Sequence, residues 1–216
     1  MSFRLPRQPS NAVIAATLAV GFASFAQTFR GPKARFWQRM TRTGLLLGSA
    51  SLASDAALRA SRPRPRDLAT GAAIAASLYG VFQLGDRAAR VVMPNGAADI
   101  EDIYALRHMR PVPEIAARLA LIIGPAEELY WRGLLQSALT RRYGRTVGAA
   151  AAAGCYGAVH LASGNPTLVG AATVAGTGWS AFAAAGVPMP ALVFSHIIWD
   201  IWIFLVQPTQ AVAKPA

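Results

Sequence analysis

Apolar residues fill most of this chain in long stretches, which are separated by short connectors rich in arginine. The stretches cover approximately residues 11–29, 43–58, 67–84, 115–139, 147–162, 167–185 and 188–207. A helix needs about 20 apolar residues to cross the hydrocarbon core of a bilayer, and most of these stretches approach that length. The pattern therefore predicts six or seven membrane-spanning helices.

The stretch at 43–58 is the exception, because it is short and carries Asp55. We expect it to be interfacial or re-entrant, although a crossing is the alternative. If it does not cross, the basic residues of the short loops all fall on one side, which the excess of Lys and Arg in cytoplasmic loops would make the cytoplasmic side. These residues are Arg30, Lys33, Arg35, Arg39, Arg42, Arg59, Arg62, Arg64, Arg66, Arg141, Arg142 and Arg145. If the stretch crosses, the basic loops divide almost evenly.

Small residues dominate most of the apolar stretches, as in GAAIAASLYG and VGAAAAAGCYGA. Such residues let membrane helices pack closely. The fold class is therefore all-α, a multi-spanning transmembrane helical bundle. The first stretch, with its basic start and the following SFAQ, resembles a signal peptide. In a chain with several later apolar helices, we expect it to be retained as an anchor.

Composition and charge agree with a membrane protein. The chain is 54% hydrophobic and only 14% charged, and its formal net charge is +11. A charge of this sign could indicate nucleic-acid binding, but the basic residues cluster at the ends of apolar runs, where each gains about 1 kcal/mol from anionic lipid head groups. The expected partners are membrane lipids and no nucleic acid. The Ala- and Arg-rich composition favours a bacterial cell membrane, and the single Cys155 excludes an internal disulfide.

One long polar connector, residues 86–114, interrupts the apolar pattern. The segment IEDIYALRHM within it predicts a short amphipathic helix on the membrane surface. We interpret Asp99, Glu101 and Asp102 as ordinary solvated charges. A role in gating substrate access is the alternative.

Several ionisable residues lie inside apolar stretches. At a bilayer centre each costs roughly 2.5 to 3.5 kcal/mol, so a chain that retains several of them is expected to use them. They are Glu127, Glu128 and Arg132 in IIGPAEELYWRGLL, His160 in AAAGCYGAVHLA, and His196 and Asp200 in LVFSHIIWDIWIFL.

Helical spacing predicts how these residues face one another. Glu128 and Arg132 are four residues apart and share a face, so the arginine can neutralise that carboxylate. Glu127 then points about 100° round the helix axis, towards something else. The pairs Tyr156 with His160 and His196 with Asp200 have the same spacing, so three helices can direct polar groups to one point. A purely structural role is disfavoured, because interhelical polar contacts average only about 0.6 kcal/mol.

Taken together, EELYWR, YGAVH and HIIWD resemble the three motifs of the CPBP family of intramembrane proteases, which includes the CAAX prenyl endopeptidase Rce1 and bacterial Abi-type proteins. Those motifs are EExxxR, FxxxH and Hxxx followed by Asn or Asp. This chain has Tyr156 in place of the Phe and Asp200 at the end of the third motif. The resemblance covers residues 113–207, which we expect to form the protease core. Residues 1–112 are expected to be N-terminal membrane helices and connector, and 208–216 a short tail.

The resemblance implies an intramembrane endopeptidase that needs no cofactor or metal and cuts membrane-associated or lipidated, CAAX-type substrates. Glu127 and His160 would bind and activate water. His196 and Asp200 would hold the oxyanion, and Glu128 with Arg132 would support the site. Asp200 donates a hydrogen bond only when protonated, so orienting His196 is its alternative role.

Two other interpretations remain open. Zinc could be ligated by Glu127 or Glu128 with His160, His196 and Asp200, although no HExxH is present. A non-enzymatic membrane immunity or scaffold protein could share the fold. Serine chemistry is disfavoured because no GxSxG occurs and Ser195 points about 100° away from His196.

The tryptophans are expected to be interfacial or packed between helices, with Trp131 and Trp199 as candidates for a substrate groove.

Overall fold

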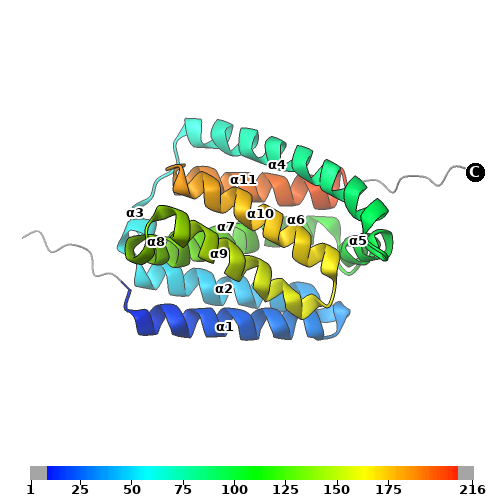
Figure 1. Ribbon diagram of the computed structural model, residues 1–216, viewed down its shortest axis with the longest axis horizontal. Coiled ribbons are helices and arrows are strands. Elements are labelled where there is room, and N and C mark those ends of the chain that lie inside the picture. Colours follow the sequence, from blue (N-terminus) through cyan, green and yellow to red (C-terminus); the bar gives the residue numbers. More distant parts are fainter. Residues whose placement is uncertain (1–8, 209–216) are drawn as a thin grey trace, which may run out of the picture.

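The computed structural model describes residues 9–208, and within this range the chain forms a bundle of helices without any strand (Figure 1). The basic start of the signal-like segment, residues 1–8, and the predicted tail beyond residue 208 lie outside the described residues. The α-helices are α1 (Asn11–Arg30), α2 (Phe36–Ser54), α3 (Ala56–Ala60), α4 (Pro65–Val92), α5 (Gly96–Ala105), α6 (Val112–Arg118), α7 (Gly124–Glu128), α8 (Ser137–Tyr143), α9 (Arg145–Val159), α10 (Pro166–Ala184) and α11 (Met189–Ile201). Short 3₁₀ turns occupy Lys33–Arg35, Leu106–His108 and His160–Ser163, and π-helical turns occupy Leu119–Ile123, Leu129–Gln136 and Trp202–Val206.

The predicted fold class, an all-α membrane bundle, is confirmed. Three helices are long and apolar enough to cross a membrane, namely Asn11–Arg30, Pro65–Val92 and Met189–Val206. These correspond to the first, third and last apolar stretches of the sequence. The total of six or seven membrane helices stays a prediction.

The interfacial or re-entrant status of the second stretch stays a prediction, and α2 is not among the three helices that are long and apolar enough to cross a membrane. Helix α2 lies beside α1 and runs back along the length of the bundle, so the connector after α1 and the connector after α2 lie at opposite ends (Figure 1). Asp55 is not inside this helix: it follows Ser54, and its Oδ1 accepts a hydrogen bond from the Ala57 amide at 2.8 Å, which caps α3. The basic connectors therefore divide between the two ends of the bundle.

A single helical rod carries the first motif. The segments α6, α7 and α8 and the π-helical turns between them follow one another without a break from Val112 to Tyr143. Pro125 lacks an amide hydrogen, and the wider hydrogen bonding of the first π-helical turn ends at Gly124, directly before it. The second π-helical turn begins at Leu129, directly after the glutamate pair. The two glutamates therefore lie between two local departures from α-helical geometry, which are frequent at functional sites.

Small residues bring neighbouring helices close to this rod, as the composition predicts. A Cβ at Gly48 of α2 would lie 3.0 Å from the Ala126 Cβ of α7. A Cβ at Gly124 would lie 3.3 Å from the Ile197 Cγ1 of α11. Helices α2 and α11 therefore pack closely against the segment that carries the glutamates.

The polar connector forms a helix where one was predicted, but its charges are not all simply solvated. The Asp99 carboxylate accepts from Thr167 Oγ1 at 2.8 Å, and its backbone carbonyl accepts from Asn165 Nδ2 at 2.9 Å. Lys33 Nζ lies 3.1 Å from Asp102 Oδ2. Glu101 is exposed, as expected. The connector is thus attached to the start of α10 and to the loop between α1 and α2.

Candidate active site

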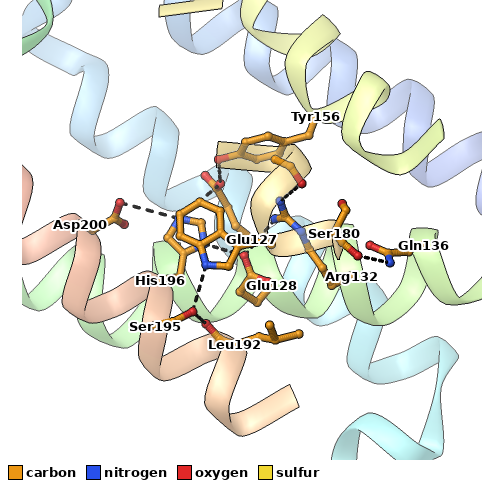
Figure 2. Close-up of polar contacts among 12 residues, drawn as sticks. Glu127, Glu128, Arg132, Gln136, Tyr156, Ser180, Leu192, Ser195, His196 and Asp200 are labelled. Atoms are coloured by element: carbon orange, nitrogen blue, oxygen red, sulfur yellow. Dashed lines mark hydrogen bonds and ion pairs between the residues drawn. The ribbon is translucent and has the colours of Figure 1, made fainter. Parts of the chain in front are cut away.

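The centre of the site is Glu128 on α7, whose side chain is completely buried. Its Oε1 accepts a hydrogen bond from Arg132 Nη1 at 2.9 Å, as the four-residue spacing predicts. The same oxygen lies 2.7 Å from His196 Nδ1 on α11 (Figure 2). A carboxylate accepts from both partners, so Glu128 joins two helices that are 68 residues apart in sequence at this contact.

Glu127 faces a different direction, towards α9. Its Oε2 accepts a hydrogen bond from the Tyr156 hydroxyl at 2.8 Å and lies 3.9 Å from His196 Nε2 (Figure 2). Among residues 9–208, no hydrogen bond uses its second oxygen, Oε1. The hydroxyl that Tyr156 adds to the expected Phe position thus has a specific acceptor.

A small cavity lies beside Glu127 between α1, α2 and α7. Its volume is about 10 Å³ and its lining is entirely apolar, so it offers a water molecule no hydrogen-bond partner. The other lining residues are Phe25, Met40, Thr43, Gly44, Leu47 and Ala126. Glu127 therefore contributes only apolar atoms to this cavity, while its carboxylate faces Tyr156 and His196.

His196 is fixed by three contacts. Its Nδ1 is engaged with Glu128, and its Nε2 lies 3.7 Å from Asp200 Oδ1. Its ring stacks on Trp179 of α10, with centroids 4.0 Å apart and planes 10° from parallel. Asp200 was the expected candidate for orienting His196, but the closer carboxylate is that of Glu128. Asp200 instead lies beyond the other ring nitrogen, on the side that Glu127 also faces.

Arg132 is held between aromatic rings and a carbonyl group. Its Nη2 donates to the Gly176 carbonyl at 3.2 Å, and its guanidinium carbon lies 4.8 Å from the Tyr156 ring centroid and 5.4 Å from that of Trp179. Gly176 makes this arrangement possible, because a Cβ there would lie 2.7 Å from Tyr156 Cδ1. A buried arginine with these partners holds Glu128 and both aromatic rings in place.

His160 lies at the other side of Tyr156. Its Nδ1 is 2.8 Å from the Tyr156 carbonyl oxygen, which accepts, so this nitrogen carries a proton and Nε2 is the acceptor in the neutral ring. Phe25 and Phe29 of α1 pack against the imidazole, with centroids 5.3 and 5.6 Å away. None of the hydrogen bonds or ion pairs in the described part of the chain joins His160 directly to Glu127.

Several residues that support the site were not identified from sequence. Trp179 stacks on His196 and also donates from Nε1 to Ser195 Oγ at 2.9 Å, and Ser195 in turn donates to the Leu192 carbonyl at 2.7 Å. Phe25 of α1 is fully buried beside His160. A large tryptophan within the small-residue stretch GTGWSAF is the sequence feature that could have pointed to Trp179. No sequence feature predicts that α1 packs against the second motif.

The two tryptophans considered for a substrate groove are packed side chains. Trp131 is fully buried and contacts the rings of Phe25, Tyr130 and Tyr156. Trp199 packs edge-on against Phe82 and Trp179. Ser195 accepts a hydrogen bond from Trp179, and among the described residues it makes none to His196.

The described residues contain no group of three or more His, Cys, Asp and Glu side chains placed to hold a metal ion. Glu127, Glu128, His196 and Asp200 are close together, but Glu128 Oε1 and His196 Nδ1 face each other across a hydrogen bond, and His160 is on the far side of Tyr156. The sets of ligands proposed for zinc are therefore not assembled in this geometry.

Comparison with known proteins identifies the part of the chain that carries this cluster. Residues 112–202 match the family described as Rce1-like, type II CAAX prenyl endopeptidase Rce1-like. The match begins at the first residue of α6, spans somewhat less than half of the chain and includes all three motifs, so the resemblance inferred from EELYWR, YGAVH and HIIWD is confirmed. Residues 112–202 are thus similar to a family that is described as type II CAAX prenyl endopeptidases. No curated protein matches the chain, and no solved structure does.

Proposed function

We propose that the protein is an intramembrane endopeptidase that hydrolyses peptide bonds of membrane-anchored or lipidated substrates, with Glu127 as the general base. The observation that carries the proposal is the arrangement of two buried glutamates with separate partners. Glu128 is engaged by Arg132 and His196, whereas Glu127 keeps one carboxylate oxygen without a hydrogen bond from the described residues. The Rce1-like match supports the same reaction.

In the proposed reaction, a water molecule lies between Glu127 and the scissile carbonyl carbon. Glu127 takes a proton from this water as the oxygen attacks the carbon, which forms a tetrahedral intermediate. When the carbon–nitrogen bond breaks, Glu127 returns the proton to the departing amine. His160, whose Nε2 is an acceptor in the neutral ring, is the second group proposed to hold the water.

His196 is proposed to stabilise the oxyanion of that intermediate. Because its Nδ1 donates to Glu128, only Nε2 remains to face the reacting group, and Nε2 donates only when the ring is an imidazolium. The Glu128 carboxylate favours this charged ring, as a carboxylate does for a triad histidine. Asp200 Oδ1, 3.7 Å from Nε2, lies at the ring nitrogen opposite Glu128, and it would hold the oxyanion with His196 as a protonated carboxyl group, which donates a hydrogen bond.

The proposed reaction draws its base, oxyanion donor and proton carrier from side chains, and so we propose no cofactor and no metal. The test is addition of a chelator to purified protein during the cleavage assay. We expect the rate to stay within about twofold, whereas a bound catalytic zinc would be lost and the rate with it.

The central experiment compares Glu127→Gln with Glu101→Gln in full-length protein reconstituted in liposomes, with a farnesylated, internally quenched CAAX peptide as substrate. Glu101 is an exposed glutamate of the connector and gives a matched change of charge. Loss of a positioned general base lowers the rate by about 10² to 10⁴, so we expect that fall for Glu127→Gln and a change below about twofold for the control.

Comparison of membrane-protein termini in cells that carry either variant extends the test to natural substrates. Full cleavage by Glu127→Gln would overturn the proposal. Identical termini in cells with and without the protein, together with an unaltered phenotype in the variant, would indicate the non-enzymatic membrane protein instead.

A further inference from the structure

Another cavity lies at the end of the bundle where α8, the start of α9 and the end of α10 meet. Its volume is about 260 Å³, far more than the roughly 10 to 15 Å³ that a single water molecule requires. The polar and charged side chains that line it are Arg132, Gln136, Ser137, Thr140 and Arg145. Arg132 also contacts Glu128, so this cavity adjoins the candidate active site through one side chain.

Two buried side chains that line this cavity have polar atoms without a partner in the described part of the chain. Arg132 is 2% exposed and Gln136 3% exposed. The atoms without a hydrogen bond there are Arg132 Nε and Gln136 Oε1. Gln136 Nε2 donates to the Ser180 carbonyl at 2.9 Å, which fixes the amide so that Oε1 is the atom left over. Buried polar atoms are nearly always paired, so these two indicate a ligand that brings both an acceptor and a donor.

The charge at this end of the bundle favours an anion. Residues 59–66 contribute four exposed arginines and residues 141–145 three, and both segments lie at this end (Figure 1). Among residues 9–208, none of these arginines forms an ion pair with a carboxylate. The carboxylates nearest to them in the sequence, Asp55 and Asp67, accept hydrogen bonds from backbone amides at the starts of α3 and α4.

The groups that line the cavity select the kind of anion. Glu128 already neutralises Arg132, and none of the described lining side chains is acidic, so Arg145 supplies one net positive charge. Arg145 is exposed, and its Nη1 donates to the Ala184 carbonyl at 3.4 Å. A phosphodiester brings one negative charge and the acceptor oxygens that arginine prefers. A hydroxyl attached to it supplies the donor that Gln136 Oε1 lacks.

The position of the cavity identifies the source of such a phosphodiester. The three helices that are long and apolar enough to cross a membrane all begin at this end of the bundle (Figure 1). The cavity is therefore at the level of the lipid head groups, where basic pockets between membrane helices bind anionic lipids. A zwitterionic lipid fits less well, because its ammonium group would lie among arginines.

We propose that this cavity binds the head group of an anionic phospholipid that carries a hydroxyl, such as phosphatidylglycerol. The phosphate accepts hydrogen bonds from Arg132 Nε and from Arg145, and the hydroxyl donates to Gln136 Oε1. The lipid is not cleaved. It occupies the remaining donor of a guanidinium whose Nη1 binds Glu128 and whose Nη2 binds the Gly176 carbonyl, and so it holds both side chains of the buried ion pair in place. Lipid binding goes beyond the proposed function and does not depend on it.

The first test is native mass spectrometry of the detergent-solubilised full chain, which resolves bound lipids by mass. Phosphatidylglycerol and phosphatidylmethanol with the same acyl chains are offered in equal amounts. Both carry one negative charge, but only phosphatidylglycerol has hydroxyls on its head group. We expect a preference for phosphatidylglycerol of about fivefold or more, because phosphatidylmethanol leaves the buried Gln136 Oε1 unpaired.

The same measurement on two arginine variants locates the lipid. Arg145→Gln is expected to lower phosphatidylglycerol binding by about fivefold or more, since a hydrogen bond to a charged group is lost. The matched control is Arg141→Gln, which removes an exposed charge at the same end of the bundle from a residue that does not line the cavity, and binding stays within about twofold. Equal binding of the two lipids, or binding that persists in Arg145→Gln, overturns the inference and leaves the cavity to water.

Inorganic phosphate shares the acceptor oxygens of the lipid and is tested separately. Calorimetry measures its binding to delipidated protein in detergent, with and without Arg145→Gln. We expect no binding at millimolar concentration, because free phosphate has no acyl chains to hold it at the membrane. Phosphate binding that depends on Arg145 would identify a site for a soluble anion and overturn the assignment to a lipid.

The effect of the lipid on Arg132 is measured as cleavage of the quenched peptide in phosphatidylcholine liposomes with and without phosphatidylglycerol. The rate is expected to rise by about fivefold or more in the wild type and in Arg141→Gln, as for coupled sites, and by less than about twofold in Arg145→Gln. An equal rise in all three would overturn the link to Arg132. A protein that cuts nothing but keeps Arg145-dependent lipid binding would remove the proposed function and support the lipid site.

Discussion

Two glutamate–arginine pairs lie on the same helical rod with the same four-residue spacing, at different depths in the bundle. Near the start of the rod, Arg118 Nη2 lies 2.8 Å from Glu114 Oε1, and the two side chains remain 25% and 35% exposed. Further along, Arg132 Nη1 lies 2.9 Å from Glu128 Oε1, and both side chains are completely buried. The local sequence pattern and the ion-pair geometry are almost the same.

The surroundings of the two pairs differ. Arg118 has one further partner, Thr41 Oγ1 of α2, at 2.7 Å. The Glu128 pair is enclosed by His196, the Gly176 carbonyl and two aromatic rings. Helical spacing alone therefore produces an ion pair in both places. What distinguishes the candidate site is the set of groups that α9, α10 and α11 bring to it.

The comparison predicts the largest difference when the arginine is removed. Arg132→Met leaves Glu128 buried without its strongest partner, and breaking a buried ion pair costs about 3 to 5 kcal/mol. Arg118→Met acts on a partly exposed pair, where solvent screens the charges, and is expected to cost at most about 1 kcal/mol. Denaturant unfolding of both variants in the same detergent measures the two values. Equal losses of stability would contradict the expectation that burial makes the Glu128–Arg132 pair costlier to break than the Glu114–Arg118 pair.

The next largest effect is expected when the carboxylate of either pair is replaced, and it is measured as the rate of cleavage. Glu128→Gln removes the charge that supports an imidazolium at His196, and we expect the cleavage rate to fall by about 10² to 10³, as for loss of an oxyanion donor. Glu114→Gln makes the same chemical change far from the cluster and is expected to stay within about twofold of the wild type. The assay is cleavage of the quenched peptide in liposomes, with folded protein matched by size-exclusion chromatography. A similar decline in both variants would contradict a special role for Glu128.

The smallest effect is expected at the hydroxyl that distinguishes Tyr156 from the phenylalanine of the family motif. Tyr156→Phe removes one hydrogen bond to Glu127 but keeps the ring that packs on Arg132, so the loss is about 1 kcal/mol and less than about tenfold in rate. Thr41→Val is the matched deletion beside Arg118, because it removes that arginine's hydroxyl partner. Stability and cleavage rate are measured for both. Complete inactivation by Tyr156→Phe would show that the hydroxyl takes part in the reaction.

The sequence predicts the helical class and the meeting of the three motifs, because both follow from local periodicity and from apolar stretches that retain charges. It does not predict that Glu128, rather than Asp200, lies next to His196 Nδ1, since this depends on the rotation of α11 against the rod. It misplaces Asp55 for a related reason. The sequence around an aspartate at the end of an apolar stretch is the same whether the residue lies in the membrane or caps the next helix. Only the direction of the chain after Ser54 distinguishes these two placements.

The packing of Phe25 and Phe29 on His160 has a consequence for the newly made protein. Helix α1 supports the second motif and α11 supplies His196, so the proposed reaction centre is incomplete until both helices are in place. During biosynthesis, when domains and segments associate in the order in which they emerge, the growing polypeptide remains without this proposed centre until α11 has docked. The endopeptidase proposed above would thereby be inert towards other newly inserted proteins in the same bilayer until α11 has joined the bundle.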